Sequence, residues 1–418
     1  MKQRTIRRIP ALLLALALLT GLCGCGGVQA GEAPGPAAAE QPAVTAAPAV
    51  SPAKDPAAPT AEPASEEPAG EPPVTLPGLT YLRRMEKAYA EQFDVYYFEG
   101  GYKYIVIGDG NRYLLVPEGQ SAPAGLDAEI KVLQGPVRKI YLAGSSSMSL
   151  FDAMDSLDTI RLSSIEKDAW YVENARAAME RGDILFGGKY SEPDYELLVD
   201  SGIDLAIENT MILHTPKVIE MIELLDIPVF IDYSSYESHP LGRTEWVKLF
   251  GALIDREEAA EAFFNSKVSV LDEIEGHENT GKTVAIFLID STGKAQVRSG
   301  TDYLAQIIGI AGGVNAFSGG DSAQTNAGMT MEEFYATALN IDYLIYNASG
   351  YSSGVTSVAK LLEMNDLLGD CKAVRNGDIW WIGPETYQHS DQISDLIQDM
   401  HLMLTGQEGE MTFLHHME

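Results

Sequence analysis

The sequence is poor in the residues that build covalent or metal cross-links. Three cysteines occur in 418 residues: Cys23 and Cys25 near the N-terminus, and Cys371 far downstream. Because Cys23 and Cys25 belong to the N-terminal signal discussed below, Cys371 is the one internal thiol, and a single thiol can form neither an internal disulfide nor a cysteine metal site. The seven histidines are scattered and set no metal-ligand spacing. The sequence therefore predicts no bare metal ion bound by the protein's own side chains and no resident cofactor.

Basic residues are also scarce. Lysine and arginine total 29 against 60 acidic residues, which gives a net charge of −31. A surface of this sign repels nucleic acid and anionic lipid, so neither is an expected partner.

A long hydrophobic run is missing as well, because the apolar segment at 11–22 is shorter than the roughly 20 residues that span a bilayer. Basic residues precede it, as in a cleaved signal peptide. The segment Leu22-Cys23-Gly24-Cys25 resembles the lipobox of bacterial lipoproteins. We therefore expect a signal peptide at 1–24 and a lipid on Cys25, which would hold the protein outside the cytoplasm on the bacterial cell membrane. An ordinary secretory signal is the alternative.

The residues after Cys25 are unsuited to folding. Residues 28–77 hold 12 of the 21 prolines and no aromatic residue, so they cannot bury enough apolar surface. We interpret 25–77 as a lipidated, disordered tether.

The rest of the chain reads as α/β, because short β-branched runs alternate with segments of helical period. Its length exceeds a single core and favours two lobes. Strands are predicted at 139–142, 159–162, 204–208 and 228–232 in the first lobe, and at 283–289, 341–346 and 378–382 in the second. An antiparallel meander is predicted at 95–116.

Two features organise these strands into similar halves. The stretches 203–209 and 341–347 share four of seven residues, although chance similarity between two strands would also explain this. Between them, 241–275 lacks proline and carries apolar residues at helical spacing, which predicts a long helical connector. The expected domains are therefore a first lobe at 78–239, a bridging helix at 240–278 and a second lobe at 279–418.

Several stretches, in this order and spacing, resemble the extracytoplasmic substrate-binding proteins for iron complexes and cobalamin. They lie at 187–196, 215–232, 234–243, 251–261, 311–315, 330–333 and 373–378. The resemblance implies two Rossmann-like lobes joined by a long backbone helix, which is the class III periplasmic-binding-protein fold. It also implies a monomer without enzymatic activity that delivers a ferric siderophore, haem or cobalamin-like ligand to an ABC permease and its ATPase.

The resemblance further implies that one exposed glutamate on each lobe pairs with arginines of the permease. By position these are Glu196 and Glu332, with Glu333 as a competitor. A carboxylate at a helix start can accept a bidentate arginine, but it can also serve only its own helix.

The ligand is expected beyond the carboxyl ends of the strands, where open α/β sheets bind ligands. Hydroxyl, amide, aromatic and charged side chains follow the predicted strands there. They are Ser145, Ser146, Lys189, Tyr190, Asn209, Tyr236, His239, Arg298, Tyr303, Asn347, Tyr351 and Tyr387. For His239 a capping role is an alternative, and for Trp170 packing within a lobe is favoured.

A rival prediction comes from Gly350-Tyr351-Ser352-Ser353-Gly354, which matches the nucleophile elbow of α/β hydrolases. A lipid-anchored serine hydrolase would need Ser352 with an acid such as Asp370 or Asp391 and a base such as His389 or His401. The chain has no His-Gly-Gly oxyanion segment ahead of the elbow, so a loop of small residues explains the same letters better.

Overall fold

The computed structural model describes residues 73–418, apart from 273, 275, 301, 319–325 and 349–353. The predicted signal peptide, Cys25 and nearly all of the tether lie outside the described residues, as do Tyr351 and Ser352. None of the helices in the described part is long and apolar enough to cross a membrane.

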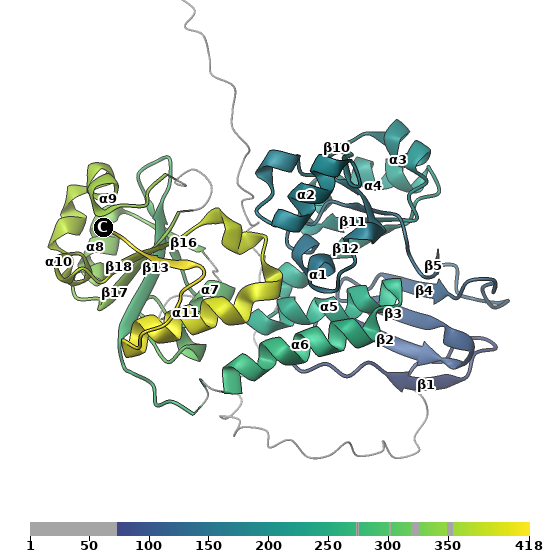
Figure 1. The fold of residues 1–418 in the computed structure, drawn as a ribbon, viewed down its shortest axis with the longest axis horizontal. Coiled ribbons are helices and arrows are strands. Elements are labelled where there is room, and N and C mark those ends of the chain that lie inside the picture. The colour runs from purple at the N-terminus through teal and green to yellow at the C-terminus, as the bar shows by residue number, and fades with distance from the viewer. Residues whose placement is uncertain (1–72, 273, 275, 301, 319–325, 349–353) are drawn as a thin grey trace, which may run out of the picture. The chain divides into compact units, whose positions relative to one another are not determined.

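The first lobe is built on a five-stranded parallel sheet (Figure 1). In sheet order its strands are β12 (Val229–Asp232), β11 (Leu205–Asn209), β6 (Ile140–Leu142), β7 (Ile160–Ser163) and β8 (Leu185–Phe186). The four strands predicted in this lobe all occur, each within one residue of its expected start and end. One face of β11, with Leu205 and Ile207, belongs to a core shared with the bridging segment, and Ala206 on the other face packs beneath two helices.

Helices and a hairpin complete the first lobe. The helices are α1 (Met148–Ala153), α2 (Glu173–Arg181), α3 (Tyr195–Ser201) and α4 (Pro216–Glu223). The hairpin consists of β9 (Gly188–Lys189) and β10 (Glu192–Pro193). Leu198 of α3 and Val218 of α4 cover the face of the sheet that carries Ala206.

The second lobe has its own sheet, in the order β16-β14-β13-β17-β18-β19, with β15 (Val314–Asn315) paired to β13. The strands predicted there appear as β13 (Thr283–Ile289), β17 (Tyr343–Asn347) and β18 (Ile379–Ile382), which run parallel. The unpredicted strands β14 (Ala295–Arg298), β16 (Asn326–Met329) and β19 (Leu414–His416) are antiparallel additions. The helices are α7 (Tyr303–Ile310), α8 (Met331–Ala338), α9 (Val358–Met364), α10 (Lys372–Asn376) and α11 (Ile393–Thr405).

A further sheet precedes the first lobe. The predicted meander is present as β2 (Phe93–Phe98), β3 (Lys103–Ile107) and β4 (Arg112–Val116), all antiparallel. The structure extends it by β1 (Tyr81–Arg84) and by β5 (Ile130–Gln134), which is parallel to β4.

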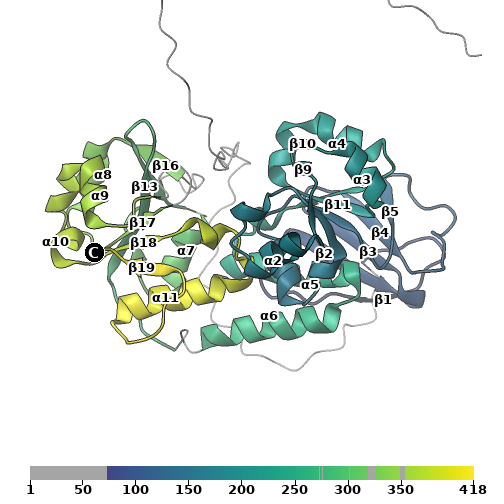
Figure 2. The same ribbon diagram turned by 45° about the horizontal axis from the view of Figure 1, so that its top comes forward.

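The predicted single helix at 240–278 is wrong in one respect, because the segment forms two helices. These are α5 (Pro240–Ile254) and α6 (Glu257–Asp272), and the helical path is interrupted at Asp255, whose φ is 58°. The two helices pack against each other (Figures 1 and 2). Gly251 allows their close approach, since a Cβ there would lie 2.7 Å from Ala260 Cβ. The physical reason is that α5 is buried on nearly all sides, and a chain reversal lets α6 cover it.

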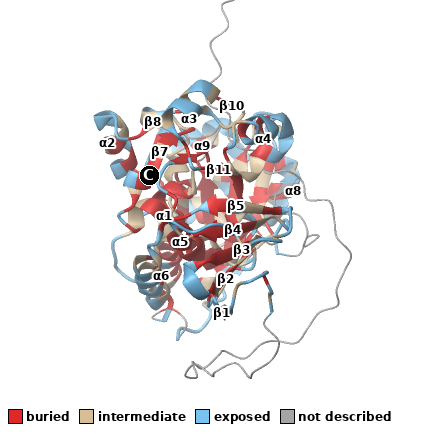
Figure 3. Cartoon of the chain, turned by 90° about the vertical axis from the view of Figure 1, so that its right-hand side faces the viewer, coloured by how far each residue is buried: buried red, intermediate tan, exposed pale blue. Residues whose placement is uncertain are grey.

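Two buried glutamates join the N-terminal sheet to α5, which is largely buried in Figure 3. The Glu245 carboxylate accepts hydrogen bonds from the backbone N–H groups of Ala88, Tyr89 and Ala90 at 2.7–2.8 Å. The Glu237 carboxylate accepts the next two backbone N–H groups, of residues 91 and 92, at 2.7 and 3.0 Å. Five backbone donors are thus satisfied by two side chains.

Candidate functional site

The second lobe brings four of the predicted ligand residues together, each at the end or start of an element. Arg298 ends β14, Tyr303 begins α7, Asn347 ends β17, and Tyr387 ends a 3₁₀ turn (Pro384–Tyr387). The Tyr387 hydroxyl accepts hydrogen bonds from Arg298 Nη2 at 3.0 Å and from Asn347 Nδ2 at 2.6 Å. We call these four residues the Tyr387 cluster.

The cluster keeps one charge in a nearly dry environment. The Arg298 side chain is 11% exposed, and its Nη1 donates to Asp302 Oδ2 at 3.1 Å. Burial acts to lower the pKa of Arg298, but Tyr387 and Asp302 raise it, and the net pKa lies above the ordinary value. Burial raises the pKa of Tyr303, so its hydroxyl stays neutral and can donate. The cluster therefore offers a fixed cation and phenolic donors beside aromatic rings.

Arg243 extends this cluster, and the sequence reasoning missed it. It lies in the first turn of α5, and its guanidinium carbon is 4.0 Å from the centre of the Tyr303 ring. Its Nη2 donates to the carbonyl of Ser235, just after β12 of the first lobe, at 3.0 Å. The available signal was a charged residue directly after Pro240-Leu241-Gly242, at the start of a largely apolar helix.

The predicted residues of the first lobe are more dispersed. Ser145 and Ser146 are half-buried, and Tyr236 is 40% exposed. Asn209 donates to the carbonyl of residue 143 at 3.0 Å and accepts from the N–H of residue 211. In the hairpin, Lys189 is exposed and Tyr190 half-buried. Among the described residues no hydrogen bond, ion pair or ring contact joins these six side chains to one another, and their role in binding stays a prediction.

Hydrogen bonds connect the second lobe to the first near the Tyr387 cluster. Gln388 Oε1 accepts the N–H of Tyr171 at 2.8 Å, and Gln388 Nε2 donates to the carbonyl of Ala169 at 2.9 Å. Thr244 of α5 donates to the carbonyl of Ser390 at 2.7 Å. Trp170, between the two partners of Gln388, is buried and donates to Ser163 Oγ at 3.2 Å, which is a packing role.

Comparison with known proteins agrees with this architecture. An uncharacterized lipoprotein of Methanocaldococcus jannaschii is 24% identical over 327 residues, which cover 72% of this chain and 75% of that protein. The periplasmic haem-binding protein HutB of Vibrio cholerae superposes with a TM-score of 0.52 at 17% identity, over 62% of this chain and 97% of its own. The petrobactin-binding protein YclQ of Bacillus subtilis gives 0.52 at 15% identity, over 66% and 94%.

The chain has the fold of the class III periplasmic binding proteins. No family model matches the sequence. The fold class predicted from the sequence is thereby confirmed.

In this periplasmic-binding fold the two predicted docking glutamates occupy equivalent positions. Glu196 lies exposed in the first turn of α3, and Glu332 lies exposed in the first turn of α8. Asp194 caps α3 by accepting the N–H of residue 197, while Glu333 forms a capping box with Thr330. Glu333 is therefore committed to its own helix, and docking through Glu196 and Glu332 stays a prediction.

His239 takes the capping role that was its alternative. Its Nδ1 accepts the N–H of Leu241 at 3.1 Å, and its ring stacks on Tyr89 at 4.3 Å. Burial lowers the pKa of His239, so the ring is neutral, as an acceptor at a helix start requires.

Of the residues that the hydrolase prediction names, the acids and the bases lie in the described part of the chain. Ser352 lies outside the described residues. His389 Nδ1 is 3.2 Å from Asp391 Oδ1. His401 is buried, with Nδ1 3.0 Å from the carbonyl of Ala311.

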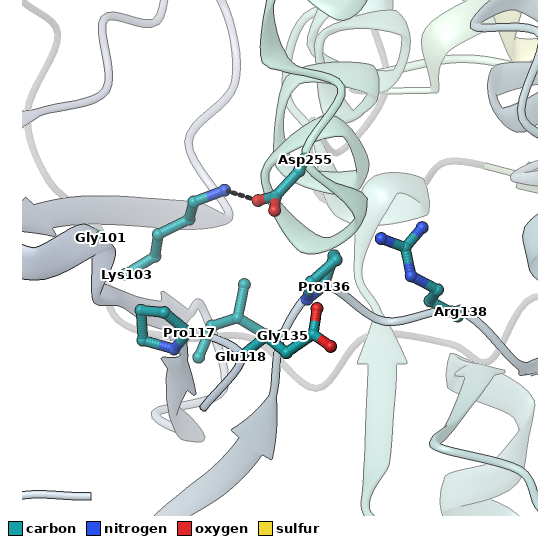
Figure 4. A pocket seen from close by; sticks show the side chains of 9 residues that line it. Gly101, Lys103, Pro117, Glu118, Gly135, Pro136, Arg138 and Asp255 are labelled. Atoms are coloured by element: carbon teal, nitrogen blue, oxygen red, sulfur yellow. Dashed lines mark hydrogen bonds and ion pairs between the residues drawn. The ribbon is translucent and has the colours of Figure 1, made fainter. Parts of the chain in front are cut away.

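A pocket of about 190 Å³ lies elsewhere, between the N-terminal sheet and the end of α5 (Figure 4). Lys103 projects into it, but its ammonium pairs with Asp255 at 2.7 Å and with Glu257. Arg138 and Glu118 also line the pocket, and no member of the Tyr387 cluster does. A lysine already neutralised by two carboxylates is poorly suited to an anionic ligand.

Proposed function

We propose that the chain is the extracytoplasmic substrate-binding lipoprotein of an ABC importer, and that it captures haem or a ferric siderophore for the membrane permease. The periplasmic-binding fold supports this role, as do HutB and YclQ, whose names give haem and petrobactin as their ligands. Energy for transport would come from the importer's ATPase, and the chain itself would perform no catalysis.

The observation that carries the proposal is the Tyr387 cluster. Arg298 remains charged though almost fully buried, and it is held against the hydroxyl of Tyr387 where β17 ends. Binding sites for bulky small molecules combine aromatic walls with a few well-placed polar groups, and the carboxyl ends of strands are where such folds place them.

The proposal extends to localisation and partners. A lipid on Cys25 would hold the chain on the outer side of the cell membrane, and the tether would let the folded part reach the permease. Glu196 and Glu332 would pair with arginines of that permease, since bidentate carboxylate pairs at an exposed rim give orientation.

A thermal-shift titration of the full chain in detergent tests the ligand class. The panel is haem, ferric hydroxamate and catecholate siderophores, and cobalamin. A ligand at 100 times its Kd stabilises the native state by about 2.7 kcal/mol. Arg298→Gln should abolish the shift, whereas the matched change at the exposed Lys294 should preserve it. No shift with any compound would refute the proposed ligand class.

A further inference from the structure

Arg243 has a side chain that the packing of α5 does not explain. Every other residue of α5 is buried, and Arg243 alone is half-exposed. One nitrogen, Nη2, is used by the Ser235 carbonyl, and the face of the guanidinium covers the Tyr303 ring. The Nε atom is buried and has no hydrogen-bond partner among the described residues. An unsatisfied buried donor is unfavourable, so this guanidinium is not fully satisfied by the described residues.

The charge of Arg243 also lacks a dedicated partner. Within the described part of the chain no carboxylate forms an ion pair with it, whereas Arg298 is paired with Asp302 at 3.1 Å. Asp232 is the acid whose charge interacts with Arg243, but its carboxylate already accepts hydrogen bonds from Ser147 Oγ and from the N–H of residue 234. A half-buried cation without a direct ion pair among the described residues is unexpected in a chain whose net charge is −31.

The groups around Arg243 include hydrogen-bond donors as well as the Ser235 carbonyl and the Asp302 carboxylate. The Arg243 guanidinium lies over the Tyr303 ring, and the charges of Arg243 and Arg298 both act on the Tyr303 hydroxyl. The Tyr387 oxygen accepts from Arg298 and Asn347, and its own O–H proton is therefore available to an acceptor on a ligand. Guanidinium and phenol donors that converge in this way match a carboxylate or another anionic oxygen.

We infer that Arg243 is a ligand-binding and specificity-determining residue that receives an anionic group of the ligand at the start of the bridging helices. The cargo is then an anionic chelate, and neutral chelates of the same size bind more weakly. This inference rests on the proposed function.

The test uses the full chain in detergent and pairs of chelates that differ in charge. Haem is compared with its dimethyl ester, and a ferric tricatecholate with the neutral ferrichrome, by titration of tryptophan fluorescence. Arg243→Gln should weaken binding of the anionic member of a pair at least tenfold and leave the neutral member within twofold. Arg256→Gln removes the same charge at an exposed position and should change neither. Arg243→Lys should recover part of the lost affinity.

Three outcomes would overturn the inference: equal loss for both members of a pair, an equal loss in Arg256→Gln, or a wild-type preference for the neutral member. The last comparison needs no variant and stands even if Arg243→Gln fails to fold. Failure of the wild type to bind any of the four chelates would instead refute the proposed function. Iron-free citrate then decides on Arg243 alone. Stabilisation of the wild type but not of Arg243→Gln sustains the inference, and an equal response of both, or no response, refutes it.

Discussion

Replacing Glu208 by glutamine should stabilise the first lobe, and increasingly so as the pH rises from 4.5 to 8. Glu208 lies in β11 and is fully buried, and within the described residues neither carboxylate oxygen has a hydrogen-bond partner. It occupies the apolar core beneath α3 and α4, where the titratable groups that interact with it are the hydroxyls of Tyr141 and Tyr195. Burial alone raises the pKa of Glu208 to about 8.

The sign follows from proton linkage. Because the folded state holds the proton up to about pH 8 while the unfolded state releases it near pH 4.5, unfolding is favoured as the pH rises between these values. The contribution of Glu208 to the free energy of unfolding is fully present below pH 4.5. Above that pH it falls by about 1.4 kcal/mol per pH unit, or roughly 3 kcal/mol by pH 7. Glutamine is uncharged at every pH and removes this slope.

Native-state hydrogen exchange of the β11 amides at pH 5, 6, 7 and 8 measures the effect locally, after correction for the intrinsic exchange rate. The wild type should lose protection with rising pH, and Glu208→Gln should stay level. The exposed Glu166→Gln serves as the matched control and should follow the wild type. Parallel curves for the wild type and Glu208→Gln would refute the reasoning.

Three further perturbations have outcomes fixed by single contacts. Glu245→Ala leaves three backbone N–H groups without an acceptor and should lower the free energy of unfolding in urea by about 3 kcal/mol or more. A loss of stability no larger than that of the exposed Glu261→Ala would contradict the role of this carboxylate. Glu196→Ala combined with Glu332→Ala should abolish ligand uptake by cells while leaving the Kd unchanged, and normal uptake would exclude both as docking residues. Gln388→Ala removes two hydrogen bonds between the lobes and should lower the stability by about 1–3 kcal/mol in the same urea assay, so an unchanged midpoint would refute its contribution.

The elements that the sequence predicted well are those whose structure is decided locally. Strands β11 and β17 are buried on both faces, so each is mostly apolar and ends in asparagine, with Glu208 of β11 as the one charged residue, and both were placed within two residues. Strand β14, Ala295–Arg298, is short and alternates small with polar residues, and it exists because β13 and β16 pair with it. Pairing of this kind depends on residues distant in the chain.

The candidate site likewise has residues that the sequence predicted and residues that it did not. The rule that ligands lie beyond strand ends selected Arg298, Asn347 and Tyr387, and the fold brought them within hydrogen-bond distance. Glu208 was overlooked because it is a single charged residue in an apolar strand, and Arg243 because it is one of three charged residues in a largely apolar helix. Whether such a residue has a partner is decided only by the tertiary environment.

The short segment from Glu237 to Glu245 is held in place at both ends, and this fixes the residue between them. Both glutamates hold the N-terminal sheet through backbone donors, and Glu237 also accepts from Trp246 Nε1 at 2.7 Å. Arg243 lies between them in the chain, so the backbone that carries its guanidinium is fixed by buried contacts before any ligand arrives. A cation positioned in advance loses little conformational entropy on binding, and the binding energy of an anionic group is then spent on the contact itself. The Glu237 carboxylate does not contact the Tyr387 cluster, but Glu237→Gln should leave Arg243 less firmly held. Binding of an anionic chelate should then weaken, while binding of a neutral chelate stays unchanged. An equal effect on both chelates would mean that Glu237 contributes to stability alone.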